Sequence, residues 1–140
     1  MSTNSGIALR QGETFQTIYC HWDGHPSTML PILRDNYNSF DKALQLISQG
    51  DASSIGPKLS PDPSQPHTFM EYQPDVCVFY HRDRGDAWHE CWPQTYTWSE
   101  LFKNTSFEYV YIFEDDHWNV YNMNGKKLDL KIFGLGGTEK

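Results

Sequence analysis

Short stretches of the chain carry apolar and β-branched residues in the pattern of β-strands, with turn residues between them. The first two stretches flank Gln11-Gly12-Glu13, which predicts a hairpin turn. The run from 76 to 80 is almost continuously apolar, which is typical of a central strand covered on both faces. Two late stretches flank the polar turn at 114–117 and predict a second hairpin. The predicted strands span residues 6–11, 14–21, 76–80, 109–113 and 118–122, with a last one over 127–133.

Three further segments are predicted to be helical. In one of them, Ser39 is placed to cap the first turn and Gly50 to end the helix. Another begins with Thr97-Trp98-Ser99-Glu100, which matches the capping box. In the third, Pro31 must lie in the first turn or bend the axis, because proline lacks the amide hydrogen that an inner turn needs. The predicted helices span residues 28–37, 41–49 and 97–104.

These elements together predict the α+β class. We expect a mainly antiparallel sheet of about five strands with two or three helices packed on it, because the apolar stripe of each helix needs a sheet face to cover. At 140 residues the chain fits a single domain, predicted to span 1–133, with a flexible tail at 134–140. Residues 56–75 are rich in proline and poor in apolar side chains, so they predict a long ordered loop or a mobile insertion.

Charge and composition disfavour several classes of partner. The net charge of −7 argues against direct binding to DNA or RNA phosphates, and it is compatible with a basic protein partner or one local basic pocket. No apolar run reaches the roughly 18 residues of a membrane span, and no secretory signal is visible, so no membrane association is expected. Three widely spaced cysteines predict reduced thiols in a cytosol rather than disulfides.

Two polar clusters give the best indication of a functional site. Each follows an apolar, strand-like run and leads to a glycine, so the strand would fix the backbone while the loop presents side chains. We predict that the ends of the two strands converge and form one ligand-binding site. Its candidate residues are His21, Trp22, Asp23, Tyr80, His81, Arg82, Asp83 and Arg84.

The most specific hypothesis about this site is that Arg82 and Arg84 bind an anionic ligand. In an extended backbone, residues two apart point to the same side, so both guanidiniums and Tyr80 would face one ligand. Two guanidiniums side by side suit a phosphate or carboxylate, and a tyrosine ring suits a stacked base. The alternative is structural, with the arginines in ion pairs that lock loops together. The acidic residues considered as their partners are Asp23, Asp51 and Asp86.

The first cluster also has a structural alternative, a corner in which Trp22 packs in the core and Asp23 makes an Asx turn. A zinc site is a further hypothesis, but the spacing of its ligands matches no established zinc pattern. No metal and no cofactor is therefore expected. The residues considered as zinc ligands are His21, His25, His89 and Cys91.

The two clusters belong to a set of motifs that resembles a family of small accessory proteins encoded by bacteriophages. The other motifs of this set are Gly50-Asp51-Ala52-Ser53-Ser54-Ile55-Gly56 and Tyr109-Val110-Tyr111-Ile112-Phe113, and the resemblance extends over residues 6–122. It implies an early, dispensable phage gene whose product is expressed in the host cytoplasm. Many such products disable host defence or redirect a host protein.

Two main function classes follow from these observations. The first is a binding protein that inhibits or sequesters a host factor or a small phosphorylated ligand, with counter-defence as its role. The alternative is a small hydrolase or transferase that acts on such a ligand with His21, His81 and Asp83. The chain lacks the recognised catalytic motifs, which favours binding over catalysis. A third, less favoured hypothesis is that the protein is a structural part of a virion.

A homo-oligomer, most simply a dimer, is also predicted. The segment from 88 to 98 is short and interrupted by a proline, and it holds more aromatic rings than it can bury alone. Exposed aromatic patches usually meet a partner. The rings are those of Trp88, Trp92, Tyr96 and Trp98.

Overall fold

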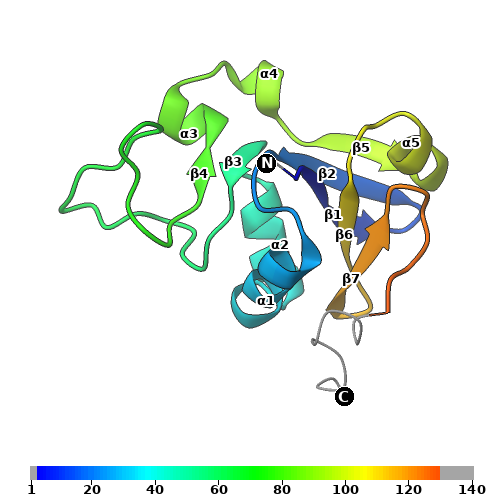
Figure 1. The fold of residues 1–140 in the computed structure, drawn as a ribbon. Coiled ribbons are helices and arrows are strands. Elements are labelled where there is room, and N and C mark those ends of the chain that lie inside the picture. Colours follow the sequence, from blue (N-terminus) through cyan, green and yellow to red (C-terminus); the bar gives the residue numbers. More distant parts are fainter. Residues whose placement is uncertain (1–2, 130–140) are drawn as a thin grey trace.

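A central hairpin of β1 (Ser5–Gln11) and β2 (Thr14–Cys20) organises the structure (Figure 1). The computed structural model describes residues 3–129. The hairpin is the one predicted from the sequence, and only Gly12 and Glu13 separate the paired strands. Gly12 has a φ of 70°, a left-handed conformation that glycine adopts without steric cost, and this allows the turn to close tightly.

Further strands extend the hairpin into a mixed sheet. They are β3 (Ala52–Ser54), β4 (Val78–Phe79), β5 (Gln94–Thr97), β6 (Tyr109–Glu114) and β7 (His117–Asn122). β6 pairs in parallel with β1, and β7 pairs antiparallel with β6, which confirms the second predicted hairpin. On its other side, β2 pairs antiparallel with β5 along its first half and in parallel with β3 at its end, and β4 lies beyond β3.

The predicted α+β class is confirmed, but the predicted sheet is only approximate. Within residues 3–129 the sheet has seven strands and is mixed, because the β1–β6 and β2–β3 pairings are parallel. The sequence analysis missed β3 and β5, which are short and built mainly from small or polar residues. Five helices accompany the sheet in this part of the chain: α1 (Pro26–Asn36), α2 (Phe40–Ile47), α3 (Tyr80–Arg84), α4 (Trp88–Cys91) and α5 (Trp98–Lys103).

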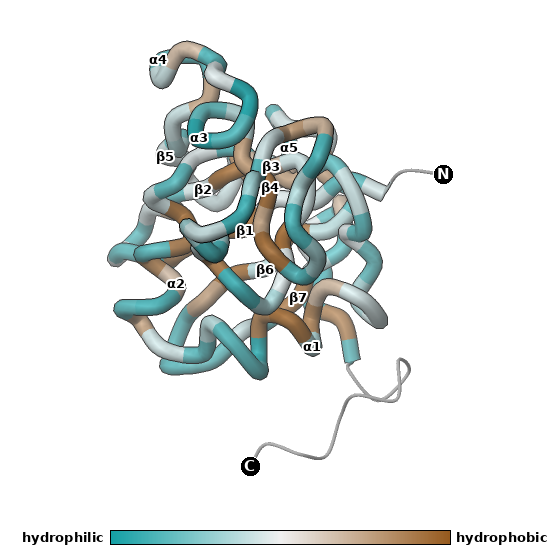
Figure 2. The backbone as a smooth tube through the Cα atoms, turned by 90° about the vertical axis from the view of Figure 1, so that its left-hand side faces the viewer, coloured by the Kyte–Doolittle hydropathy of each residue, from teal (hydrophilic) through white to brown (hydrophobic). Residues whose placement is uncertain are grey.

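Apolar side chains cover both faces of the sheet. On one face, Ile7 of β1 shares an apolar cluster with Leu33 of α1 and Leu46 of α2. On the other face, Ala8 of β1 belongs to a second cluster with Leu101 of α5. Figure 2 shows hydrophobic segments gathered on the inner strands and on α1. β1 is therefore buried on both faces, the position that the sequence analysis assigned to residues 76–80.

That assignment of 76–80 to a central strand is wrong. β4 contains only two residues and lies at the end of the sheet, and Tyr80 already begins α3. The segment is buried because the chain before it covers the sheet edge. The Lys58 amide donates to the carbonyl of Asp75, and the Cys77 amide donates to the carbonyl of Lys58, each over 2.9 Å. An apolar run can thus be buried by a loop as well as by a layer of helices.

The predicted N-terminal caps are in place, but α2 ends at Ile47 with Ser48 as its C-cap, two residues before the predicted end next to Gly50. The Ser39 side chain accepts from the Lys42 amide at the start of α2, and Thr97 and Glu100 form both bonds of the capping box at α5. α1 begins two residues earlier than predicted, and Pro31 lies inside it. None of the helices in the described part of the chain has the length and apolar character needed to cross a bilayer.

Only part of the last predicted strand, over 127–133, can be compared with the structure. Residues 127–129 are described, and Lys127 forms an isolated bridge with Tyr121. The rest of that strand and the tail predicted at 134–140 lie outside the described residues.

Candidate functional site

The short strand β3 brings the two polar clusters next to each other. The His21 amide donates to the carbonyl of Ala52 over 3.1 Å, and the Trp22 amide donates to the carbonyl of Ser53 over 2.9 Å. On the other side of β3, the Tyr80 amide donates to the carbonyl of Asp51 over 3.2 Å. The first cluster and Tyr80 therefore share a backbone scaffold.

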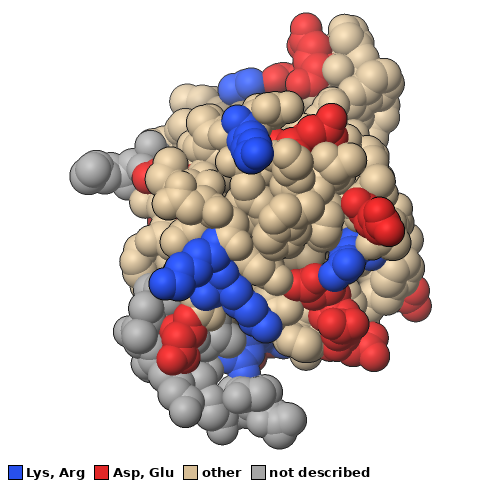
Figure 3. Space-filling model, turned by 90° about the vertical axis from the view of Figure 1, so that its right-hand side faces the viewer, with Lys and Arg blue, Asp and Glu red and all other residues tan. Residues whose placement is uncertain are grey.

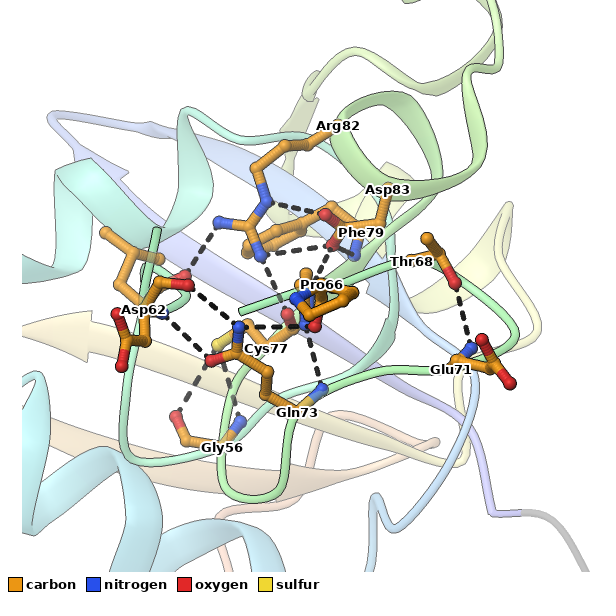
Figure 4. Close-up of polar contacts among 12 residues, drawn as sticks. Gly56, Asp62, Pro66, Thr68, Glu71, Gln73, Cys77, Phe79, Arg82 and Asp83 are labelled. Carbon is orange, nitrogen blue, oxygen red and sulfur yellow. Dashed lines mark hydrogen bonds and ion pairs between the residues drawn. The ribbon is translucent and has the colours of Figure 1, made fainter. Parts of the chain in front are cut away.

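Arg82 points away from that scaffold and into the loop at 56–75 (Figure 4). Its guanidinium donates to both carboxylate oxygens of Asp83 over 2.9 and 3.0 Å. The other two bonds reach backbone carbonyls, at 2.7 Å to Leu59 and 2.8 Å to Cys77. Phe79 lies under the guanidinium, 4.9 Å from its central carbon to the ring centroid. All three guanidinium nitrogens are thus engaged by the protein itself. This is the structural role that the alternative proposed, but the acidic partner of Arg82 is Asp83 and not Asp23, Asp51 or Asp86.

Asp83, the acidic partner of Arg82, makes further buried contacts. Its side chain is 4% exposed, and it accepts a hydrogen bond from the Phe79 amide over 2.8 Å. His67 Nε2 lies 3.3 Å from Oδ2 of the same carboxylate, while its Nδ1 accepts from the Gln73 amide. Because Nδ1 accepts, a neutral His67 must carry its proton on Nε2, which faces Asp83. The loop at 56–75 is therefore tied to α3 through buried polar contacts, as an ordered loop would be.

Arg84 occupies a different position from Arg82. Residues 80–84 form a helix that ends at Gly85, so the expectation that both arginines lie on one side of an extended strand is wrong. The Arg84 guanidinium makes a two-pronged ion pair with Asp86, over 2.7 and 2.8 Å, and its central carbon lies 4.4 Å from the centroid of the Tyr80 ring. Its side chain is 46% exposed. His81 Nδ1 lies 2.8 Å from the carbonyl of Asp86.

A cleft of about 510 Å³ opens beside the first cluster. The exposed aromatic side chains of Trp22 and Tyr72 line the cleft. The structural alternative in which Trp22 packs in the core is therefore wrong. Asp23 and Asp75 also line the cleft, and both have left-handed backbone conformations, with φ of 59° and 64°. None of the described lining residues is a lysine or an arginine. The cleft therefore favours ligands that are cationic or that donate hydrogen bonds, and it disfavours anions.

Gly24 fixes the backbone that carries Trp22 and Asp23. A Cβ at this position would lie 2.7 Å from the carbonyl oxygen of Thr3, so no larger residue fits without movement. The Gly24 amide donates to that same carbonyl over 2.9 Å, and the Gly24 carbonyl accepts from the Tyr111 hydroxyl over 2.6 Å. The glycine that follows Trp22-Asp23 thus has a structural reason, the close approach of two chain segments.

The thiols and histidines considered in the sequence analysis lie in separate surroundings in the described structure. Burial raises the pKa of Cys20 to about 12 and also raises the pKa of Cys77, so both thiols stay protonated near neutral pH. His21 Nδ1 lies 2.6 Å from the hydroxyl of Tyr19, two residues earlier in the chain. Within residues 3–129, no three His, Cys, Asp or Glu side chains are grouped closely enough to hold a metal ion.

Asp51 is a polar residue that the candidate site of the sequence analysis did not include. It lies where β2 changes partner from β5 to β3, and its Oδ1 accepts from the Tyr19 amide over 2.9 Å, in place of a neighbouring strand. Burial raises the pKa of this carboxyl from 3.8 to about 6, against the lowering effect of that hydrogen bond. Its position depends on the register of three strands, which sequence patterns do not reveal.

Replacing Asp51 with asparagine is expected to stabilise the protein at pH 7.5 by about 1 kcal/mol, allowing for solvent screening of a half-buried group. The folded-state pKa lies above the ordinary value, so the carboxyl weakens the fold as the pH rises from about 4 to about 6. Asparagine keeps the oxygen that accepts from the Tyr19 amide. Urea unfolding of both proteins between pH 4 and 8 measures the difference, which should vanish near pH 4. Asp116→Asn, in the exposed β6–β7 turn, should show no such step, and a less stable Asp51→Asn protein at pH 7.5 would contradict the prediction.

The comparisons with known proteins found no relatives. No protein-family model matches the chain, and neither the curated proteins nor the solved structures gave a significant match. Only the residues and geometry of this chain therefore bear on its function.

Proposed function

We propose that the protein acts by binding, and that the cleft beside Trp22 receives a positively charged segment of a partner protein. The observation that carries the proposal is the composition of the cleft. Two aspartates and two exposed aromatic rings line it, without a basic side chain among the described lining residues. Lysine and arginine side chains bind such surfaces through ion pairs and through contacts with aromatic faces. The net charge of −7 adds long-range attraction for a basic partner.

The earlier hypothesis of a small phosphorylated ligand receives less support from the geometry. It required Arg82 and Arg84 to grip the ligand together, but Arg82 is bound to Asp83 and two carbonyls, and Arg84 is paired with Asp86. The hydrolase or transferase alternative required His21, His81 and Asp83 to act together. Asp83 is bound to Arg82 and to the Phe79 amide, and His81 Nδ1 lies 2.8 Å from the carbonyl of Asp86.

The resemblance to phage accessory proteins leads us to propose that the partner is a host protein. Binding would take place in the host cytoplasm and would serve counter-defence.

Formation of a homo-oligomer also remains a proposal. Trp88, Trp92 and Trp98 are 38–45% exposed, and on the face that carries α5 and β7 an uncharged area lies between scattered basic and acidic side chains (Figure 3). Analytical ultracentrifugation at micromolar concentration tests the oligomer, and a monomer there would contradict it.

Fluorescence anisotropy with labelled peptides tests the cleft. We expect a lysine- and arginine-rich peptide to bind, and Asp23→Asn or Asp75→Asn to weaken it about tenfold each, the effect of losing one charge-assisted bond. Trp22→Ala should weaken it similarly. Asp116→Asn is the matched control, because it removes the same charge from another residue with positive φ that does not line the cleft. An equal loss of peptide affinity in all three aspartate variants would mean that net charge, and not the cleft, causes the binding, and this would contradict the proposal. Stronger binding of a phosphopeptide would contradict it as well.

A further inference from the structure

Asp83, Glu114 and Asp51 carry carboxylates that are partly or largely withdrawn from solvent, and they differ in how their charge is compensated. Asp83 is paired with Arg82 and accepts from the Phe79 amide. Glu114 is paired with Arg10 over 3.1 Å, and it accepts from the Tyr121 hydroxyl and the Asn119 amide group as well. Burial alone would raise the pKa of Glu114, but these three bonds lower it.

Asp51 has no such compensation. Within residues 3–129, its carboxylate receives a single hydrogen bond, from the Tyr19 amide to Oδ1. No lysine or arginine is among the causes of its pKa shift, which is upward. A carboxylate that is half-buried without a counter-charge is costly for the fold, and functional sites are where such costs are usually found.

A pocket of about 270 Å³ lies in front of this carboxylate. It is lined by residues of β2, of β5 beside it in the sheet, and of the segment after α5, and it shares no lining residue with the cleft. Tyr19, Tyr96 and Phe107 supply aromatic surface to it, and the Tyr19 and Phe107 rings are stacked with centroids 6.3 Å apart. Thr105 and Ser106 add hydroxyl groups.

We propose that this pocket is a second binding site, which takes a small organic cation whose ammonium group pairs with the Asp51 carboxylate. The ammonium would bring the counter-charge and the hydrogen-bond donors that Asp51 lacks. The aliphatic part of the ligand would lie against the aromatic rings, which also attract the charge through their π faces. A ligand of this kind can be an amine metabolite or the end of a lysine side chain, and both present the same chemistry.

The composition of the pocket argues against the other charge classes. An anion would meet the Asp51 carboxylate with none of the described lining residues to neutralise it, because none is a lysine or arginine. A neutral alcohol could accept or donate hydrogen bonds but would leave the carboxylate without a counter-charge. Among residues 3–129, the titratable groups whose pKa is raised in part by the Asp51 charge are Tyr19 of β2, Cys91 of α4 and Tyr96 of β5, and with a raised pKa they stay neutral between pH 5 and 8.

A matched set of four-carbon probes tests the proposal. n-Butylamine, 1-butanol and butyrate have the same chain and differ in the charge of one end. Titration of the full chain, followed by the amide NMR signals of Tyr19, Tyr96 and Thr105, should show butylammonium binding at pH 8 at least about tenfold more tightly than butanol, with no binding of butyrate. Binding should weaken as the pH falls to 5, because Asp51 then takes up a proton. N-acetyllysine amide, compared with butylamine, distinguishes a lysine side chain from a free amine as the source.

Asp51→Asn is the deciding variant, because it keeps the acceptor for the Tyr19 amide and removes the charge. We expect it to lose at least about tenfold in affinity for butylammonium, while Asp116→Asn binds as the unchanged protein does. Equal affinity for butanol, unchanged affinity of Asp51→Asn, or no shift of the Tyr19 amide at tens of millimolar probe would overturn the proposal. Shifts centred on Trp22 and Ser54 would place the amine in the cleft, which supports the proposed function but overturns this second site.

Discussion

Replacing Arg82 with alanine is expected to lower the free energy of unfolding by about 3 kcal/mol, which for a chain of this size lowers the melting temperature by about 10 °C. The guanidinium holds Asp83, the Leu59 carbonyl and the Cys77 carbonyl, and it covers the Phe79 ring. Its removal leaves a carboxylate that is 4% exposed without its cation, and two carbonyls without their donors. Thermal unfolding followed by circular dichroism measures the effect.

Arg84→Ala is the matched control for this prediction. Arg84 belongs to the same short helix, but its side chain is 46% exposed and its partner Asp86 is accessible to water. We expect a loss of no more than about 1 kcal/mol, the usual value of an exposed ion pair. Similar small losses for both variants would show that Arg82 is not a structural residue, and the hypothesis that it recognises an anionic ligand would then regain its basis.

Gly50→Ala is expected to destabilise the protein by about 3 kcal/mol, from the sum of backbone strain and a steric clash. Gly50 has a φ of 87°, which disfavours any residue with a Cβ. A Cβ there would also lie 2.5 Å from the Cys91 carbonyl oxygen and 2.9 Å from the Trp88 ring. The backbone of α4 would have to move, and with it the hydrogen bond from the Asp51 amide to Cys91. Chemical denaturation with urea measures the loss.

Gly12→Ala separates the two causes of that loss. Gly12 has a similar φ of 70°, but nothing lies within 4 Å of the Cβ position. Only the backbone strain remains, so we expect a cost of about 1 kcal/mol. If Gly50→Ala cost no more than Gly12→Ala, the close packing of α4 against the turn after α2 would be contradicted.

Elements with local signals could be predicted from the sequence. The β1–β2 hairpin depends on Gly12, and the start of α5 depends on the Thr97–Glu100 capping box, so a few neighbouring residues decide each. The helix at 80–84 was not predicted, because the apolar run before it leads into the polar helix without any turn residue between them. The two-residue strand is formed by pairing with β3, and the helix is bound by the loop at 56–75 through Leu59 and Phe69, so distant residues decide both elements.

The candidate site was predictable only in outline. Trp22, Asp23 and Tyr80 lie around β3, but β3 itself has three residues and no strand pattern of its own. The roles of Arg82 and Arg84 could not be separated from sequence, because a helix sends side chains two apart in different directions and a strand does not. Asp51 was missed because its burial results from the change of strand partner along β2.

The parallel pairing of β1 with β6 has a consequence for how this protein is made. Asn4 and Glu108 bind each other although they are 104 positions apart in the sequence, so one edge of the first strand has no partner until most of the polypeptide has left the ribosome. Pairing between such distant segments slows folding, and the open, apolar edge of β1 is prone to aggregation until β6 has paired with it. Truncation before β6 should therefore give an aggregating product rather than a smaller folded unit, and the yield of the full chain should depend on the rate of translation and on chaperones.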